Sequence, residues 1–205
     1  LRGRAENAGA DRPTGTFRGT SARSGGKVSL TIERKGGSRT EIVAPLVIGA
    51  DGASSVVRNA FFGKSAAPRY VFAYHEIIDR PDPNDGADYA PERCDVIYDG
   101  RISPDFYGWV FPHGERASVG TGSGLRSHDL KEATALLRAE AGLAGCRTVR
   151  REGAPLPLKP MRKWDDGRNV VLAGDSAGVV APSSGEGIYY AMLCGRLCAR
   201  AVAET

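Results

Sequence analysis

Two short apolar runs, each followed at once by aspartate and glycine, constrain the fold of this chain more than any other feature. The first run, 46–50, leads into Asp51, and the second, 170–173, leads through one glycine into Asp175. Uninterrupted apolar runs of this length are typical of strands buried on both faces of a parallel sheet. Because ligands of such sheets gather beyond the carboxyl ends of the strands, we expect both aspartates at a binding site.

Glycines beside these aspartates favour close approach of a cofactor. Gly52 and Gly174 adjoin the two carboxylates, and glycine lets the backbone come near a ligand. Gly185 and Gly187 open a helix expected over 188–202, whose start offers amides and a positive dipole end to an anionic group. For either aspartate alone, a turn cap that bonds the following amides is the more economical interpretation. The two motifs together favour a cofactor site.

The segment between the motifs predicts an antiparallel sheet. Alternation and turn residues predict strands near 15–20 and 28–34, a further strand running into 46–50, and then strands at 70–78, 94–98, 107–111 and 117–121. Asp129 is the expected N-cap of a helix that stops before Gly142. Three prolines over 155–160 predict an extended connector. The fold class is therefore α/β, an α+β hybrid, with domains at 1–62, 63–154 and 155–205, the first and last belonging together.

Three aromatic residues alternate along one predicted strand. Tyr107, Trp109 and Phe111 are each two positions apart, so their side chains share one face. Such a face forms an apolar wall with polar atoms on tyrosine and tryptophan, suited to a long hydrocarbon chain. The same face could equally pack into an ordinary core, and the pattern alone leaves both interpretations open.

The residues around the two aspartates resemble a known flavoprotein family. The stretch 51–58 is similar to the D-G-x-x-S-x-V-R signature of flavoproteins related to p-hydroxybenzoate hydroxylase, and 174–177 with 185–187 resembles that family's second FAD motif. The resemblance implies a Rossmann-like FAD-binding domain interrupted by an antiparallel substrate domain. It implies that Asp175 contacts the flavin sugar chain and that Asp51 and Arg58 lie near FAD and NADPH.

Within that family the match narrows to geranylgeranyl reductases. The stretch 104–112 resembles their P-x-x-Y-x-W-x-F-P motif, and 156–160 and 179–192 resemble the chlorophyll and bacteriochlorophyll branch. The resemblance covers the chain from about Gly15 and implies an FAD-dependent, NADPH-consuming reductase that saturates the geranylgeranyl chain of (bacterio)chlorophyll to phytyl. The implied substrate is the geranylgeranylated pigment or geranylgeranyl diphosphate. The resemblance also implies that Pro112 belongs to the substrate wall. Tyr107 is a weak proton-donor candidate, because a phenol with a pKa of about 10 is a poor acid.

The family's N-terminal G-x-G-x-x-G, which holds the ADP half of FAD, is missing, so we expect the chain to be a fragment. Three alternatives stay open at this point. The first is a flavin-dependent aromatic monooxygenase, and the second is a geranylgeranyl reductase acting on diphosphate or lipid-linked chains. The third is a non-catalytic lipid- or flavin-binding module.

The composition argues against several classes of binding function. The formal charge is +4, and the 28 basic residues are spread thinly rather than clustered, which argues against nucleic-acid binding. The four cysteines lack C-x-x-C spacing and His75, His113 and His128 are scattered, so no metal site is expected. Without an uncharged apolar stretch of about 18 residues, we expect a cytoplasmic protein with peripheral membrane contact.

Overall fold

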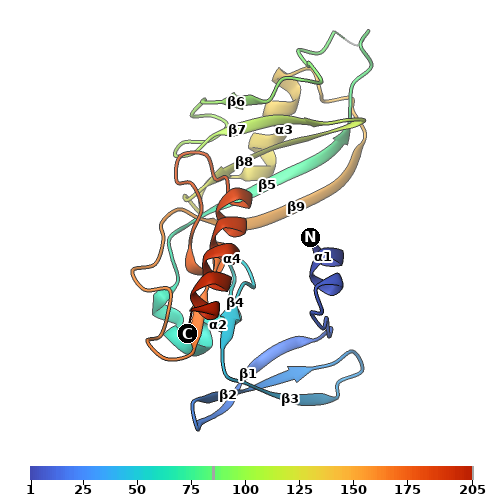
Figure 1. The fold of residues 1–205 in the computed structure, drawn as a ribbon. Helices are drawn as coiled ribbons and strands as arrows, with labels where there is room; N and C mark the ends of the chain where they lie inside the picture. The colour runs from blue at the N-terminus through green and yellow to red at the C-terminus, as the bar shows by residue number, and fades with distance from the viewer. Residues whose placement is uncertain (85, 205) are drawn as a thin grey trace. The chain divides into compact units, whose positions relative to one another are not determined.

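The computed structural model describes residues 1–84 and 86–204, which form two compact units (Figure 1). The first unit comprises Leu1–Pro68, Lys159–Ala181 and Glu186–Thr205, and the second comprises Arg69–Leu158 and Pro182–Gly185. Parallel and antiparallel sheets are both present, so the predicted mixed α/β fold class is confirmed.

Two sheets build the first unit. After the helix α1 (Arg2–Asn7), an antiparallel sheet contains β1 (Thr16–Ser24), β2 (Lys27–Glu33) and β3 (Arg39–Ala44), and a parallel pair contains β4 (Val47–Gly49) and β10 (Val170–Leu172). The strand expected to run into 46–50 is thus two strands in two sheets. Pro45 separates them, because its nitrogen cannot donate to the ladder of β3.

Helical segments follow the two parallel strands. The helix α2 (Val56–Phe62) and the 3₁₀ turn η1 (Lys64–Ala66) come after β4, whereas η2 (Gly174–Ala177) and α4 (Ile188–Ala203) come after β10. Their apolar faces share one core with the strands, centred on residues such as Val47, Val57, Val170 and Leu172. This core fixes the strand ends from which the two sequence motifs project.

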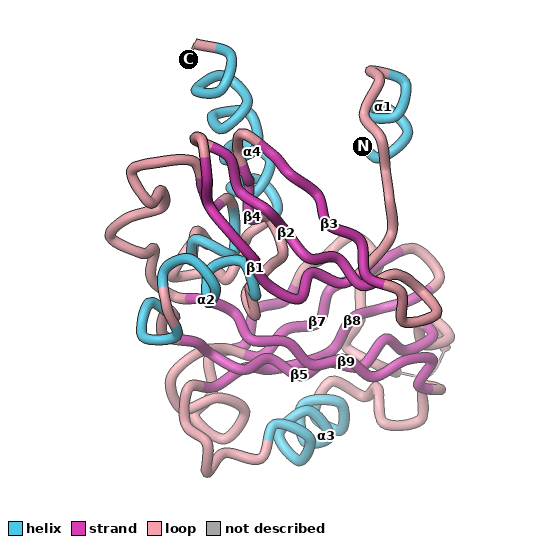
Figure 2. Tube along the Cα trace, turned by 90° about the horizontal axis from the view of Figure 1, so that it is seen from below, coloured by secondary structure: helices cyan, strands magenta, loops and turns pink. Residues whose placement is uncertain are grey.

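The second unit is a five-stranded antiparallel sheet with one helix on one face (Figure 2). Its strands are ordered β6 (Asp95–Ile97), β7 (Gly108–His113), β8 (Arg116–Ser123), β5 (Tyr70–Asp79) and β9 (Thr148–Pro157), and the helix is α3 (Leu130–Glu140). Asp129 caps α3 as predicted, accepting hydrogen bonds from the amides of Lys131 and Glu132 at 2.9 and 3.1 Å. Ile78, Val119 and Leu137 pack between helix and sheet.

The proline-rich connector predicted over 155–160 is wrong for its first part, since Pro155 and Pro157 lie within β9. They pair with Phe72 and Tyr70 of β5. Within this sheet β9 is an edge strand, and an edge strand tolerates proline because one side of its backbone has no strand partner. The sequence signal was therefore correct about extended backbone and missed the pairing.

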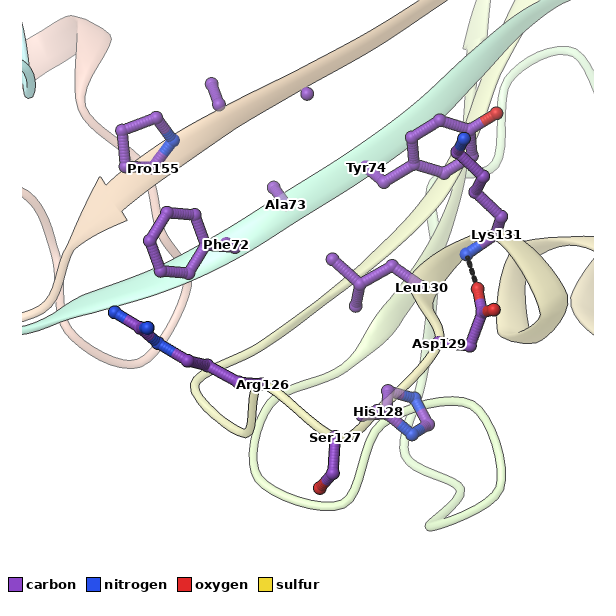
Figure 3. A pocket seen from close by; sticks show the side chains of 12 residues that line it. Phe72, Ala73, Tyr74, Arg126, Ser127, His128, Asp129, Leu130, Lys131 and Pro155 are labelled. Carbon is purple, nitrogen blue, oxygen red and sulfur yellow. Dashed lines mark hydrogen bonds between the residues drawn. The ribbon is translucent and has the colours of Figure 1, made fainter.

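A pocket of about 660 Å³ opens beside the first turn of α3 (Figure 3). Phe72 and Pro155 form part of its apolar lining, and Arg126 and Lys131 contribute positive charge. It lies on the face of the sheet that α3 covers. None of its lining residues is predicted to be functional from the sequence.

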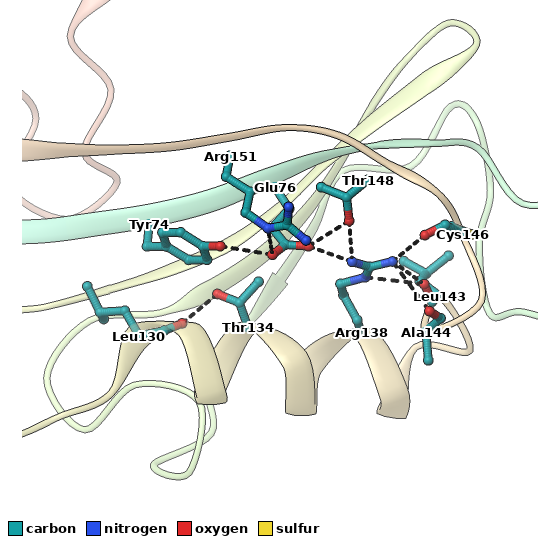
Figure 4. Close-up of polar contacts among 10 residues, drawn as sticks. All are labelled: Tyr74, Glu76, Leu130, Thr134, Arg138, Leu143, Ala144, Cys146, Thr148 and Arg151. Carbon is teal, nitrogen blue, oxygen red and sulfur yellow. Dashed lines mark hydrogen bonds and ion pairs between the residues drawn. The ribbon is translucent and has the colours of Figure 1, made fainter.

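A buried ion pair crosses from the sheet to α3 (Figure 4). The Glu76 carboxylate lies 2.5 Å from Arg138 Nη1, and both side chains are about nine-tenths buried. It also accepts hydrogen bonds from Tyr74 and Thr148 at 2.9 and 3.0 Å. Burial acts to raise the pKa of Glu76, but its hydrogen-bond donors, including Arg138 and Arg151, together hold that pKa below its usual value.

We predict that Glu76→Gln destabilises the protein by about 3 kcal/mol, because it leaves the Arg138 charge buried without a counter-charge. A carboxylate with a lowered folded-state pKa stabilises the fold above its unfolded pKa, and that stabilisation is lost as the pH falls through the folded value. Urea unfolding at pH 7 and pH 3, followed by circular dichroism, should therefore show a smaller acid effect in Glu76→Gln than in the wild type. Glu115→Gln, which removes the exposed partner of Arg80, is the control and should change neither quantity.

Candidate functional site

Asp51 is built into the start of α2. Its carboxylate accepts hydrogen bonds from Ser55 Oγ at 2.5 Å and from the amides of Val56 and Val57 at 2.8 and 3.1 Å. Ser55 Oγ in turn accepts from the Arg58 amide at 2.8 Å. The adjacent Gly52 has φ +79°, which favours glycine. The contacts of Asp51 match the turn-cap interpretation, and its predicted place beside a cofactor stays a prediction.

Arg58 connects the two sequence motifs. It is 2% exposed, and its Nη1 donates to the carbonyls of Ala53 at 2.9 Å and Ser176 at 3.3 Å. Its Nε is buried without a partner among the described residues. Ser176 Oγ is also buried and donates to the Gly49 carbonyl at 2.5 Å. These bonds hold the ends of β4 and β10 together, a framework role that the sequence did not reveal for Ser176.

Asp175 differs from Asp51 in having an open carboxylate. Its one hydrogen bond in the described part of the chain comes from its own backbone amide, and desolvation by burial raises its pKa. The start of α4 lies against it: a Cβ placed on Gly187 would come 3.2 Å from Asp175 Oδ1. A half-buried acceptor with spare capacity at a strand end is suited to binding sugar hydroxyls.

The remaining predicted glycines lie at close contacts. Gly174 has φ +63°, and a Cβ there would approach Ala191 of α4 to 3.2 Å. Gly187 caps α4, which has no side-chain cap, although Glu186 already accepts a hydrogen bond from the Tyr189 amide at 2.8 Å. Gly185 belongs to the second unit and lies near Phe106. In the first unit the structure therefore brings together Asp175, Gly174 and Gly187.

The aromatic residues of 107–111 form a continuous row in the second unit. The ring centroids of Tyr107 and Trp109 are 5.9 Å apart, and those of Trp109 and Phe111 are 6.2 Å apart. Tyr107 and Trp109 are each 8% exposed, whereas Phe111 and Pro112 are partly exposed. The row lies on the face of the sheet opposite α3, since the intervening Val110 packs into the core beneath that helix. We call the row of Tyr107, Trp109 and Phe111 the aromatic wall. Pro112, which was predicted to belong to it, alternates with Val110 onto the other face of β7.

The environment of Tyr107 makes it a poorer proton donor than a free phenol. Its hydroxyl donates to the Ser184 carbonyl. Burial, with a smaller contribution from Tyr98, raises its pKa. Both effects hold the proton on the phenol, so Tyr107 is better suited to shaping the wall than to acid catalysis.

Glycines on β8 make room for this wall. A Cβ on Gly120 would come 2.4 Å from His75 Cβ and 2.7 Å from the Trp109 ring, and one on Gly122 would meet Val71 and Phe106. The absent side chains let Trp109 of β7 approach His75 of β5 across β8. The alternating glycines at 120, 122 and 124 are the sequence signal for this close packing.

Comparison with known proteins gives extensive sequence similarity. The chain is 54% identical over 201 residues to geranylgeranyl diphosphate reductase of Rhodobacter capsulatus, covering 98% of this chain and 50% of the relative. It is 37% identical over 213 residues to the chloroplastic enzyme of that name from Oryza sativa subsp. japonica, covering 98% of this chain and 45% of the relative. The chain thus spans about half the length of these curated relatives. No protein-family model matches it.

Solved structures share the fold. A geranylgeranyl bacteriochlorophyll reductase-like protein from Thermoplasma acidophilum superposes with a TM-score of 0.74 at 24% identity, covering 90% of this chain and 47% of that chain. The flavin-dependent halogenase CmlS gives a TM-score of 0.62 at 19% identity, covering 86% of this chain and 33% of that chain. At these identities the likeness concerns the fold. With the sequence matches, it confirms the family resemblance: along nearly its whole length this chain is a homologue of the geranylgeranyl reductases.

Proposed function

We propose that this chain is part of an FAD-dependent reductase that saturates double bonds of a geranylgeranyl chain, with NADPH as the reductant. The observation that carries the proposal is the 54% identity to a geranylgeranyl diphosphate reductase across 98% of the chain. The open Asp175 carboxylate and the aromatic wall supply sites for a flavin and for a hydrocarbon chain. The substrate is a geranylgeranylated (bacterio)chlorophyll, with geranylgeranyl diphosphate as the alternative.

The first unit has polar groups that fit part of FAD. Asp175 would accept hydrogen bonds from the sugar hydroxyls, and the start of α4 at Gly187 would face the anionic portion of the cofactor. A side chain at position 187 would crowd the Asp175 carboxylate, so glycine keeps this approach open. When bound, FAD supplies two-electron transfer between a nicotinamide and an alkene.

In the second unit, the aromatic wall would bind the prenyl chain and exclude water from it. Trp109 is fixed at its polar end, because its Nε1 donates to Ser118 Oγ at 3.0 Å. Trp109 is 8% exposed, so a small part of its apolar surface would meet the chain. A wall held in place in this way orients a flexible chain at less entropic cost than mobile side chains would.

The proposed substrate also bears on where the protein acts. No helix in the described part of the chain is long and apolar enough to cross a membrane. Prenylated pigments partition into membranes, so we expect the cytoplasmic protein to contact the membrane peripherally. High salt or carbonate would then release it from membrane fractions.

We predict that Asp175→Ala weakens FAD binding by about 1.5–3 kcal/mol, or about tenfold to hundredfold, because an ionised hydrogen-bond acceptor is lost. Isothermal titration of the full-length apoprotein with FAD measures the change. Asp51→Ala is the matched comparison: it should lower the melting temperature through loss of the α2 cap. Flavin affinity unchanged in Asp175→Ala would remove this residue from the cofactor site.

The raised pKa of Asp175 gives a pH prediction with a definite sign. The ionised carboxylate is the better acceptor, so FAD affinity should fall as the pH decreases through this pKa. Because burial raises that pKa, the fall begins at a higher pH than for an ordinary aspartate. In Asp175→Asn, FAD affinity should be weaker at neutral pH and should lack this acid dependence.

We predict that Trp109→Ala impairs prenyl reduction far more than flavin binding. Removing a buried tryptophan ring forfeits about 3–5 kcal/mol of contact energy, enough to raise the KM for the prenyl substrate at least about 100-fold. Bound FAD is measured by absorbance, and chain saturation by mass spectrometry. Tyr98→Ala, which removes an aromatic ring that is 77% exposed, is the control. Equal loss of flavin, solubility and reduction in Trp109→Ala would indicate a core role instead.

A further inference from the structure

A chain of polar side chains crosses the sheet behind the aromatic wall. Trp109 Nε1 donates to Ser118 Oγ at 3.0 Å, Ser118 Oγ lies 2.8 Å from His75 Nδ1, and His75 Nε2 lies 3.2 Å from Glu152 Oε2. These four residues come from β7, β8, β5 and β9, which are neighbours in the sheet. The His75 and Trp109 ring centroids are 6.2 Å apart. The chain therefore ends directly at the wall.

The hydrogen positions follow from which atoms can donate. The indole of Trp109 only donates, so Ser118 Oγ accepts from it. Glu152 is a carboxylate whose other oxygen lies 3.0 Å from Arg150 Nε, so it accepts from both neighbours and His75 carries a hydrogen on Nε2. The remaining hydroxyl hydrogen of Ser118 then points to His75 Nδ1. In this arrangement His75 is neutral and every polar atom of the chain has a partner.

The same chain is also complete when His75 gains a proton. Nδ1–H then donates to Ser118 Oγ, the imidazolium lies beside the Glu152 carboxylate, and the Ser118 hydroxyl hydrogen is released to point elsewhere. By alternation along the strands, the ionisable groups on this face include Asp79, His113, Arg116 and Arg150. Arg150 is paired with Glu152, Asp79 is paired with Arg147, and the Tyr107 hydroxyl donates to a carbonyl. Only the Ser118 hydroxyl has to rotate for His75 to change its charge.

We propose that His75 holds the proton consumed in alkene reduction and that Ser118 passes it to the prenyl chain. The inference rests on the proposed function, because reduction of an isolated double bond requires a proton as well as a hydride. The π electrons of the double bond would take this proton at one carbon, and the other carbon would receive the hydride that FAD supplies when bound. The acid is the His75 imidazolium, because an alcohol alone is a weaker acid than the phenol of Tyr107. As Ser118 gives up its hydroxyl hydrogen it takes the hydrogen of Nδ1, and His75 becomes a neutral imidazole. Glu152, whose side chain is 44% exposed, returns a proton from solvent.

The protonation pattern can be observed without catalysis. Nitrogen-15 NMR of the full-length apoprotein, with His75→Gln used to assign the signal, should show neutral His75 protonated at Nε2. A neutral ring protonated at Nδ1 overturns the proposal.

The kinetic test separates proton supply from binding. Glutamine at position 75 can still hydrogen-bond but cannot hold a transferable proton, so His75→Gln should lower kcat about 100-fold with little change in KM. A proton donor must be charged to act, so wild-type kcat should fall with rising pH, and the variant should lack this dependence. Ser118→Ala should lower kcat similarly, and Ser118→Thr should restore part of the loss. His113→Gln, at an exposed turn of the same unit, should behave as wild type.

The outcomes distinguish this inference from the function on which it rests. Prenyl reduction by the wild type with undiminished kcat in His75→Gln overturns the role of His75 and leaves the proposed function intact. If the flavin-loaded wild type reduces no prenyl chain, the proposed function fails and the proton-transfer step fails with it. Parallel loss of FAD binding and KM in His75→Gln indicates a structural role and also overturns the inference.

Discussion

The geometry of the first unit depends on how two very short parallel strands are held together. The strands β4 and β10 contain three residues each, so their ladder alone is a weak constraint. Ser176 Oγ donates to the Gly49 carbonyl, and Arg58 donates to the Ser176 carbonyl. These buried bonds join the residues that follow one strand to those that follow the other. With the ends fixed, Asp175 is held next to the start of α4 with its carboxylate still available.

In the second unit, glycines leave room for large aromatic rings on one face of the sheet. Gly120 and Gly122 provide a side-chain-free strip on β8, and Trp109 crosses it to approach His75. The opposite face is closed by α3 and by the buried Glu76–Arg138 ion pair. One face of the sheet thus packs against α3, and on the other face the aromatic rings lie beside the polar chain.

The sequence predicts features that depend on residues close together in the chain. It misses those that depend on pairing between strands far apart in the chain. Asp129 was recognisable as a cap because its partners are the next amides in the chain. Pro155 predicted extended backbone but gave no sign that β5 would pair with it. The spacing of 107–111 places three rings on one face of a strand. To choose between a ligand-binding wall and an ordinary core, the positions of the neighbouring strands are also needed. His75 could not be assigned for the same reason, since its partners lie 43 and 77 residues away along the chain at Ser118 and Glu152.

The two aspartates show why motif resemblance and site chemistry must be judged separately. Both follow a buried strand and both belong to a family-like motif, but Asp51 is engaged by one hydroxyl and two amides of its own helix. Asp175 has no such partners in the described residues, and its burial raises its pKa. The cost of removing a buried acceptor from water is met when the protein folds. A buried acceptor without partners therefore gains more from a ligand's hydroxyl donors than an acceptor that the fold already satisfies. The difference in spare hydrogen-bonding capacity therefore supports the proposal of Asp175 as the cofactor ligand, whereas Asp51 stabilises the start of α2.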